Sequence, residues 1–167
     1  PFAPLERPEG ARGKPEHDPI ACIACAACAN VCPPNAIQML IEADKGQTTW
    51  SINFGRCIFC GRCEEVCPTH AIVLSKEFEL AVMNKEDLEE RCTYDMARCS
   101  ECGEYYATVK QVDYATRILS QLPGDLEAQQ AAALTGVCPK CKQKADAYRN
   151  KRRDELVGGK RKMEAKR

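Results

Sequence analysis

Residues 22–37 read CIACAACANVCPPNAI, and residues 57–72 read CIFCGRCEEVCPTHAI. The two stretches match at a constant offset of 35 residues, at all four cysteines and at five further positions. Those five are the isoleucine after the first cysteine, the valine before the last cysteine, the proline after it and the closing Ala-Ile pair. So many coincidences indicate an internal repeat, and two copies of one unit predict a domain with pseudo-two-fold symmetry.

Both copies follow the pattern C-x2-C-x2-C-x3-C-P. This pattern ligates 4Fe–4S clusters in bacterial two-cluster ferredoxins, where the fourth cysteine of each run serves the other cluster. Three thiolates on a tight loop can bind one face of a cluster, whereas the fourth follows on a short helical turn and points toward the other copy. We therefore predict two 4Fe–4S clusters, one held by Cys22, Cys25, Cys28 and Cys67, and the other by Cys57, Cys60, Cys63 and Cys32.

The alternative for these eight cysteines is a set of structural zinc knuckles. Zinc sites usually use two separated cysteine pairs, with no fourth cysteine at this spacing and no proline after it. Neither histidine is placed as a ligand: we expect His17 to be solvated in a proline-rich stretch, and His70 to lie at the surface or beside the ligands. The spacing therefore favours iron–sulfur clusters.

A second cysteine set, Cys99, Cys102, Cys138 and Cys141, has C-x2-C spacing in both halves. Such pairs can close a tetrahedron of thiolates around one ion, and they resemble those of zinc ribbons and rubredoxin. Thiolate ligands suit zinc or a single iron. We expect a structural staple, because so small a region has little core of its own; a redox-active mononuclear iron or four free thiols are the alternatives. We expect Cys92, outside both sets, to be a free thiol.

The composition supports metal ligation over disulfide bonds. The chain has 13 cysteines in 167 residues, an odd number gathered in tight groups. We therefore expect a reducing, cytosolic compartment. No apolar run approaches the roughly 20 residues that span a bilayer. No nucleophile–base pair, phosphate loop or dinucleotide fingerprint is visible, so we expect no active site of the chain's own.

Short strands are expected in the cysteine-rich half. Residues 37–41 and 49–53 are rich in strand-forming residues and flank the turn residues 44–46, and residues 72–74 occupy the matching place after the second copy. Residues 76–98 are acidic, and Asn84 resembles the N-cap of a helix over residues 85–91.

Helices are expected in the remaining half. Val112, Ala115, Ile118, Leu119 and Leu122 recur at helical spacing. A second helix is expected from Asp125 to about Thr135, and a polar helix from Cys141 to Leu156, ended by Gly158-Gly159.

Together these patterns predict an α+β fold of five parts. They are an extended arm (1–19), a two-cluster ferredoxin domain (20–76), an acidic helical linker (77–98), a four-cysteine region (99–145) and a basic helical tail (146–167). A solvated tail is the alternative for the arm, which can also lie along a partner subunit.

The charge is distributed unevenly although the net charge is zero. From Lys140 to the end, twelve Lys and Arg face four Asp and Glu, which leaves about +8 there and about −8 elsewhere. A solvated helix is one interpretation. The others, in order of preference, are docking on a protein partner, on an anionic membrane surface and on nucleic acid. Tyr148 is the only aromatic residue among the basic ones, so we expect no nucleic-acid partner.

The region 22–72 is similar to the two-cluster ferredoxin family, and more narrowly to the iron–sulfur subunit of complex I and its hydrogenase relatives. The stretch RGKPE at 12–16, the stretch CIFCGRCEEVCPT at 57–69 and the four-cysteine region together resemble the small iron–sulfur subunit of formate hydrogenlyase and hydrogenase 4. Complex I homologues usually lack the four-cysteine region, so this region discriminates between the two. Cys99, Cys102, Cys138 and Cys141 match the knuckles of the family.

This resemblance implies an electron-transfer subunit, not an enzyme in itself, in a membrane-bound nickel–iron hydrogenase. It would relay electrons from a ferredoxin-like, formate dehydrogenase-linked subunit toward the hydrogenase small subunit. The large subunit and the membrane arm would be further partners, at the cytoplasmic face of the inner membrane. The alternatives are a subunit of a complex I-type quinone oxidoreductase, a free ferredoxin, and a metal-stapled adaptor or nucleic-acid binder.

Overall fold

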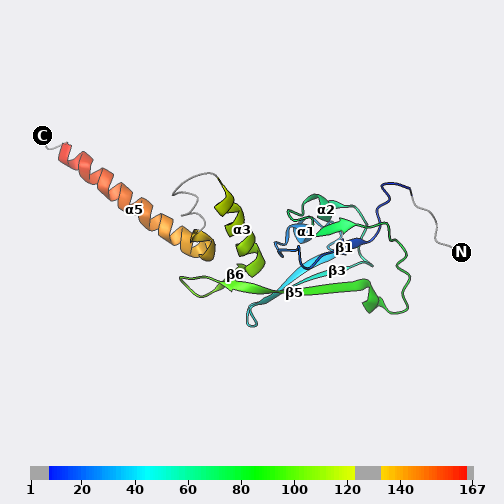
Figure 1. Cartoon of the computed structure of the whole chain (residues 1–167). Helices are drawn as coiled ribbons and strands as arrows, with labels where there is room; N and C mark the ends of the chain where they lie inside the picture. Colours follow the sequence, from blue (N-terminus) through cyan, green and yellow to red (C-terminus); the bar gives the residue numbers. More distant parts are fainter. Residues whose placement is uncertain (1–7, 123–132, 165–167) are drawn as a thin grey trace. The chain divides into compact units, whose positions relative to one another are not determined.

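The computed structural model describes residues 8–122 and 133–164 (Figure 1). The chain divides into two compact units. The first comprises the chain up to Met96 together with Ala107–Tyr114, and the second comprises Ala97–Tyr106 and the chain from Ala115 onward. The eight cysteines of the repeat lie in the first unit, and the four-cysteine set lies in the second.

The sequence repeat is reproduced in the backbone of the first unit. Each copy carries a one-turn helix, α1 (Ala27–Asn30) and α2 (Arg62–Glu65). Left-handed backbone angles recur at the same offset of 35 residues; the φ values are 52° and 53° at Ala24 and Phe59, 63° and 81° at Ala26 and Gly61, and 53° and 52° at Asn35 and His70. Most of these residues are not glycine, so the conformation is costly and is held by its surroundings. The predicted pseudo-two-fold domain is confirmed.

Residues 1–7 of the predicted extended arm lie outside the described residues, and the rest of the arm is not a solvated tail where it meets the domain. Strand β1 (Pro15–His17) pairs antiparallel with β4 (Ile72–Leu74), with His17 opposite Ile72. Just before β1, the N–H of Gly13 donates to the Ser75 carbonyl at 2.9 Å. A Cβ atom at this glycine would clash with the Glu77 carbonyl oxygen, so only glycine fits there.

Besides the sheet of β1 and β4, the structure contains a four-stranded sheet with the order β2-β3-β5-β6. Its strands are β2 (Ile37–Glu42), β3 (Gln47–Asn53), β5 (Glu89–Arg98) and β6 (Tyr105–Thr108). The predicted strands at 37–41, 49–53 and 72–74 are confirmed. Figure 1 shows α1, α2 and β1 on one side of β3 and β5.

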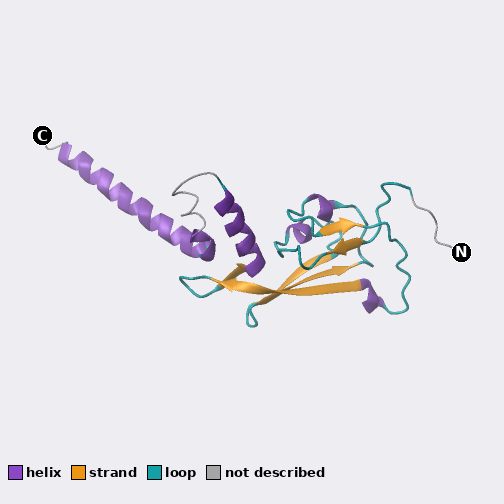
Figure 2. Cartoon of the chain, viewed as in Figure 1, coloured by secondary structure: helices purple, strands orange, loops and turns teal. Residues whose placement is uncertain are grey.

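The predicted helix over residues 85–91 is wrong. Asn84 does cap a helical turn, since its side chain accepts from the Glu86 N–H at 3.3 Å, but this turn is the short 3-10 helix η1 (Lys85–Leu88). Strand β5 follows at once (Figure 2). Its inward side chains, Cys92 and Tyr94, alternate with outward ones, and β5 pairs with β3 from Glu89 to Asp95. Pairing with β3 outweighs the helical preference of the acidic residues.

The core of the first unit lies between the sheet and the cysteine loops. Thr48, Trp50 and Ile52 alternate inward along β3 and are buried. Ile37 of β2 and Ile72 of β4 complete this layer, and several of the cysteines pack against it. The cysteine loops are therefore fixed against a rigid sheet.

Helices dominate the second unit. Helix α3 (Val109–Gln121) confirms the predicted helix around residues 112–122. The helix expected from Asp125 lies largely outside the described residues, and the 3-10 helix η2 (Leu134–Gly136) precedes α5 (Pro139–Glu164). Helix α5 starts earlier than expected, with proline at its first position, where proline is favoured. It also continues through Gly158-Gly159, so the predicted stop there is wrong.

Within the residues that the structure describes, no helix is long and apolar enough to cross a membrane.

Candidate metal centres

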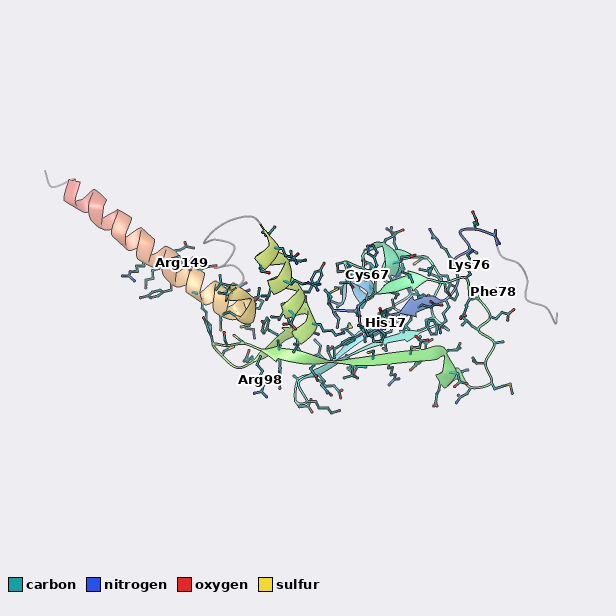
Figure 3. All side chains as sticks on the ribbon, in the orientation of Figure 1. His17, Cys67, Lys76, Phe78, Arg98 and Arg149 are labelled. Carbon is teal, nitrogen blue, oxygen red and sulfur yellow. The ribbon has the colours of Figure 1, made fainter. Side chains whose placement is uncertain are left out.

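The first cavity of the cysteine-rich unit is lined by cysteines from both repeats. Cys22, Cys25 and Cys28 come from the first copy and Cys67 from the second. Trp50 of β3 and His17 of β1 also line it; Figure 3 labels His17 and Cys67. About 360 Å³ of this region is not filled by protein atoms.

The second cavity mirrors the first. Cys57, Cys60 and Cys63 of the second copy line it together with Cys32 of the first. Its unfilled space, about 320 Å³, is close to that of the first cavity. The structure thus brings the eight predicted cysteines together in the two crossed quartets that the motif spacing predicts.

Backbone N–H groups are aimed at the cysteine sulfurs in both copies. Ala24 donates to Cys22 Sγ at 3.3 Å, and at the matching place Phe59 donates to Cys57 Sγ at 3.4 Å. The donor residues have the positive φ angles described above, which turn their N–H groups toward the sulfur. Hydrogen bonds of this kind favour a thiolate over a thiol.

Burial has the opposite effect on most of these thiols. It raises the pKa of Cys22, Cys28 and Cys57, and it raises the pKa of Cys63 to about 11. At Cys67 burial also works to raise the pKa, but hydrogen bonds from the Thr69 backbone and hydroxyl and from the Ala71 backbone outweigh it, so this pKa is lowered. Negatively charged thiolates that are partly buried close together need a compensating positive charge, which bound iron would supply.

A buried donor in the first cavity also fits a cluster. The Trp50 side chain is 1% exposed, and its Nε1 is a buried polar atom with no hydrogen-bond partner among the described residues. A buried N–H without an acceptor is rare and costly. Sulfur atoms in the cavity would supply the acceptor, so the residues present fit a 4Fe–4S cluster.

Helix α3 begins beside the first cysteine loop. Thr108, just before the helix, donates its hydroxyl to the Ile23 carbonyl at 2.7 Å. Lys110 Nζ donates to the carbonyls of Pro19 and Ile20 at 2.7 and 2.9 Å. These contacts fix the loop that carries Cys22 and Cys25, and no sequence pattern pointed to them.

The four-cysteine set is more compact than the two quartets. The sulfur atoms of Cys99, Cys102, Cys138 and Cys141 all lie within 4.8 Å of one another. Cys102 Sγ is 3.7 Å from Cys138 Sγ. A tetrahedron of sulfurs about 2.3 Å from a zinc ion has edges of about 3.8 Å. The set therefore has the dimensions of a site for one tetrahedral ion.

Two local structures hold this set. Cys99 and Cys102 lie in the turn between β5 and β6, where Gly103 has a φ of 73° and donates to the Cys99 carbonyl at 2.9 Å. Cys138 and Cys141 lie at the start of α5. The backbone N–H groups of Cys102 and Cys138 lower the pKa of the Cys99 thiol to about 6, which favours a metal-binding thiolate.

Three of the four cysteines also form most of the core of the second unit, as far as the structure describes it. Its buried hydrophobic cluster consists of Cys99, Cys138, Cys141 and Val137, with Tyr106 packed against it. A core this small is typical of regions that a metal ion stabilises.

Two side chains beside the first cavity, His17 and Tyr94, lie where the sequence patterns did not place them. His17 was expected to be solvated, and this is wrong: its ring stacks on Trp50 with the centroids 3.8 Å apart. Tyr94 is buried, and its hydroxyl lies 3.4 Å from His17 Nε2. Strand alternation in 92–95 would have placed Tyr94 inward, but nothing local signals that His17 is covered. His70 is exposed, as expected.

Cys92 lies outside both cysteine sets, on β5 opposite Trp50. It is a free thiol packed against the core of the first unit.

Comparison with known proteins agrees with this geometry. The family model of the 4Fe–4S dicluster domain matches residues 21–71. Formate hydrogenlyase subunit 6 of Escherichia coli (strain K12) is 44% identical over 143 residues, which cover 86% of this chain and 79% of that relative. A chain of the membrane-bound sulfane sulfur reductase, an archaeal respiratory membrane complex, is 29% identical with a TM-score of 0.41, over 52% of this chain and 47% of that chain.

The fold and the cavities thus define an iron–sulfur protein with a 4Fe–4S, ferredoxin-type domain. Within that class, the long match to the curated relative is decisive because it extends through both units of the chain. The chain belongs to the formate hydrogenlyase subunit 6 family.

Proposed function

We propose that the chain is the electron-transfer subunit of a formate hydrogenlyase-type, membrane-bound nickel–iron hydrogenase. It carries two 4Fe–4S clusters and one zinc or iron ion, and it relays electrons toward the hydrogenase small subunit. The observation that supports this most strongly is the crossed lining of the two cavities, three cysteines from one repeat and one from the other. Membership of the formate hydrogenlyase subunit 6 family supports the choice of complex.

In this proposal each quartet of cysteines holds one cluster. Cys22, Cys25, Cys28 and Cys67 hold the first, and Cys57, Cys60, Cys63 and Cys32 hold the second. When bound, the clusters supply one-electron redox chemistry. The chain's own residues hold the thiolates, exclude water with the apolar sheet face and donate backbone N–H groups to sulfur.

Cys99, Cys102, Cys138 and Cys141 hold the single ion, which we propose to be a structural staple. The sulfur spacing and the small core of this unit support that role.

The basic helix α5 supports a peripheral subunit that docks on acidic surfaces of its partners. From Gln143 to Arg152 its residues are all exposed, so it presents no buried face of its own there. The proposed partners are the hydrogenase small and large subunits, a ferredoxin-like formate dehydrogenase-linked subunit and the membrane arm, at the cytoplasmic face of the inner membrane. Docking of this kind weakens as salt is added.

The crossed assignment is tested by exchanging single ligands in protein purified without oxygen. We expect Cys67→Ser to alter the EPR spectrum of the cluster that Cys22→Ser alters, and Cys32→Ser to alter the spectrum of the other cluster. If Cys67→Ser instead perturbed the same cluster as Cys57→Ser, each repeat would hold its own cluster and the crossed assignment would be wrong.

The parent complex is tested by isolating the tagged full chain from its native host. Copurification of a nickel-containing subunit in stoichiometric amount is expected. A chain that is isolated alone at every salt concentration would favour a free ferredoxin instead.

A further inference from the structure

The two cysteine quartets accept matching hydrogen bonds from backbone N–H groups. The contacts of Ala24 with Cys22 and of Phe59 with Cys57 are one matched pair, at 3.3 and 3.4 Å. Another matched pair is formed by Ala36 with Cys32 Sγ and Ala71 with Cys67 Sγ, both at 3.2 Å. Because these contacts recur at the offset of 35 residues, a difference between two bound clusters must come mainly from side chains.

Side-chain donors gather around the first quartet. The Thr69 hydroxyl lies 3.7 Å from Cys67 Sγ, whereas the matching position in the first copy is Pro34, which has no hydroxyl. The Tyr94 hydroxyl lies 3.4 Å from Nε2 of His17, which lines the same cavity. One of the four sulfurs therefore already has a side-chain donor.

Trp50 provides a further donor. Its indole lines the first cavity and is buried, and its Nε1 has no hydrogen-bond partner among the described residues. Stacking on His17, with an interplanar angle of 16°, holds the ring in this orientation.

Among the described residues, the second quartet has no matching set of side-chain donors. Of the polar side chains around its cavity, Arg62 is exposed and its Nη1 pairs with Glu65 at 3.2 Å. Arg12 is exposed as well, and it donates to the Cys60 carbonyl at 2.8 Å, not to sulfur. Exposed charges are screened by water and salt. In the part of the chain that the structure describes, no buried side chain donates to the second quartet.

We propose that the Trp50 indole N–H donates a hydrogen bond to sulfur at the first cluster site and makes that cluster the more easily reduced of the two. Thr69 assists it at Cys67. Reduction adds one electron and one negative charge while the proton stays on the indole nitrogen, and donors to sulfur stabilise the more negative state. The inference rests on the proposed function, because it requires both clusters to be bound.

One isotope label tests the contact directly, because Trp50 is the only tryptophan of the chain. Holoprotein is prepared with ¹⁵N in the indole ring and reduced stepwise without oxygen. Pulsed EPR is expected to show a ¹⁵N coupling, and a coupling to one exchangeable proton lost in deuterated water, for the cluster that is reduced first. A coupling confined to the cluster reduced second, or found with neither cluster, would overturn the inference.

The energetic effect is tested with Trp50→Phe, which keeps an aromatic ring against His17 and removes the N–H. At the potential where the first cluster of the wild-type protein is half reduced, the reduced-to-oxidised ratio of this cluster in Trp50→Phe is expected to be about tenfold lower. This corresponds to a midpoint shift of about 59 mV for one electron. The midpoint of the other cluster should not move. The matched control is Ile52→Val, which loosens packing at another buried position on the same face of β3 and removes no donor. It should leave both midpoints in place.

The outcomes separate this inference from the proposed function. Iron and sulfide are counted before every titration. If Trp50→Phe keeps a full complement of clusters and both midpoints stay unchanged or fall equally, the role of Trp50 is overturned and the proposed function is not. Absence of clusters from the wild-type protein would overturn the proposed function. If Trp50→Phe fails to fold, the labelled wild-type protein still decides the question.

Discussion

At the scale of single residues, the surroundings of the first cavity are set by three side chains that are distant in sequence. His17, Trp50 and Tyr94 come from β1, β3 and β5, and they meet only because the two sheets pack together. Burial lowers the pKa of His17, and Lys110 adds to this, whereas Glu90 and Asp18 oppose it. His17 is therefore held in its neutral form.

This state of His17 predicts a dependence of stability on pH. Because its folded pKa lies below the ordinary value of 6.5, protonation favours the unfolded chain, so stability is lost as the pH falls below about 6.5. In His17→Phe, which keeps a ring against Trp50, the loss between pH 7.5 and 5.5 should be smaller. Denaturant midpoints of the holoprotein at the two pH values measure this effect. An equal loss in the variant and the wild type would assign the pH dependence to other groups.

At the scale of elements, the repeat could be predicted and the long-range pairings could not. The strands at 37–41 and 72–74 follow from their matching places after the two cysteine motifs, and the strand at 49–53 follows from its strand-forming residues after the turn at 44–46. The quartets follow from the spacing of the cysteines. The strand at 89–98 was mistaken in part for a helix because Lys85–Glu89 is locally helix-forming, whereas its strand character comes from pairing with β3. His17 was misplaced for the same reason, since only pairing of β1 with β4 buries it.

The pairing of β1 with β4 depends on a close approach at Gly13. A methyl group there would meet the backbone of Glu77 and Ser75, neither of which can swing away. We therefore expect Gly13→Ala to destabilise the first unit by about 1–3 kcal/mol, measured by chemical denaturation of the holoprotein. The control is Gly136→Ala, since a methyl group at Gly136 has no heavy atom within 4 Å. An equal effect of both substitutions would show that the close contact is not the cause.

At the scale of the whole molecule, the chain combines two metal-binding units of different kinds. The first spreads eight cysteines over two cavities, and the second gathers four sulfurs within 4.8 Å. The wider spacing suits a multi-iron cluster, and the tight set of sulfurs suits one ion. The match to the relative extends into both units, so the second unit belongs to the part of the chain that is similar to this family.

Removal of one ligand from the second unit should therefore affect one ion and no cluster. We expect Cys138→Ser to lose the single metal, to retain about eight irons and to expose the start of α5 to proteolysis, because the metal ligands form most of its core. Cys92→Ser is the matched control, since Cys92 lies outside both sets and should cost no metal. Loss of cluster iron from Cys138→Ser would show that the two units are not independent.

The central claim is that eight cysteines hold two cubane clusters. Its most direct test is Mössbauer spectroscopy of ⁵⁷Fe-enriched, oxygen-free holoprotein, combined with chemical analysis of iron and acid-labile sulfide. We predict about eight irons and eight sulfides per chain in 4Fe–4S form, with one further zinc or iron ion. Protein that contains zinc at the eight cysteines and no labile sulfide would contradict the account.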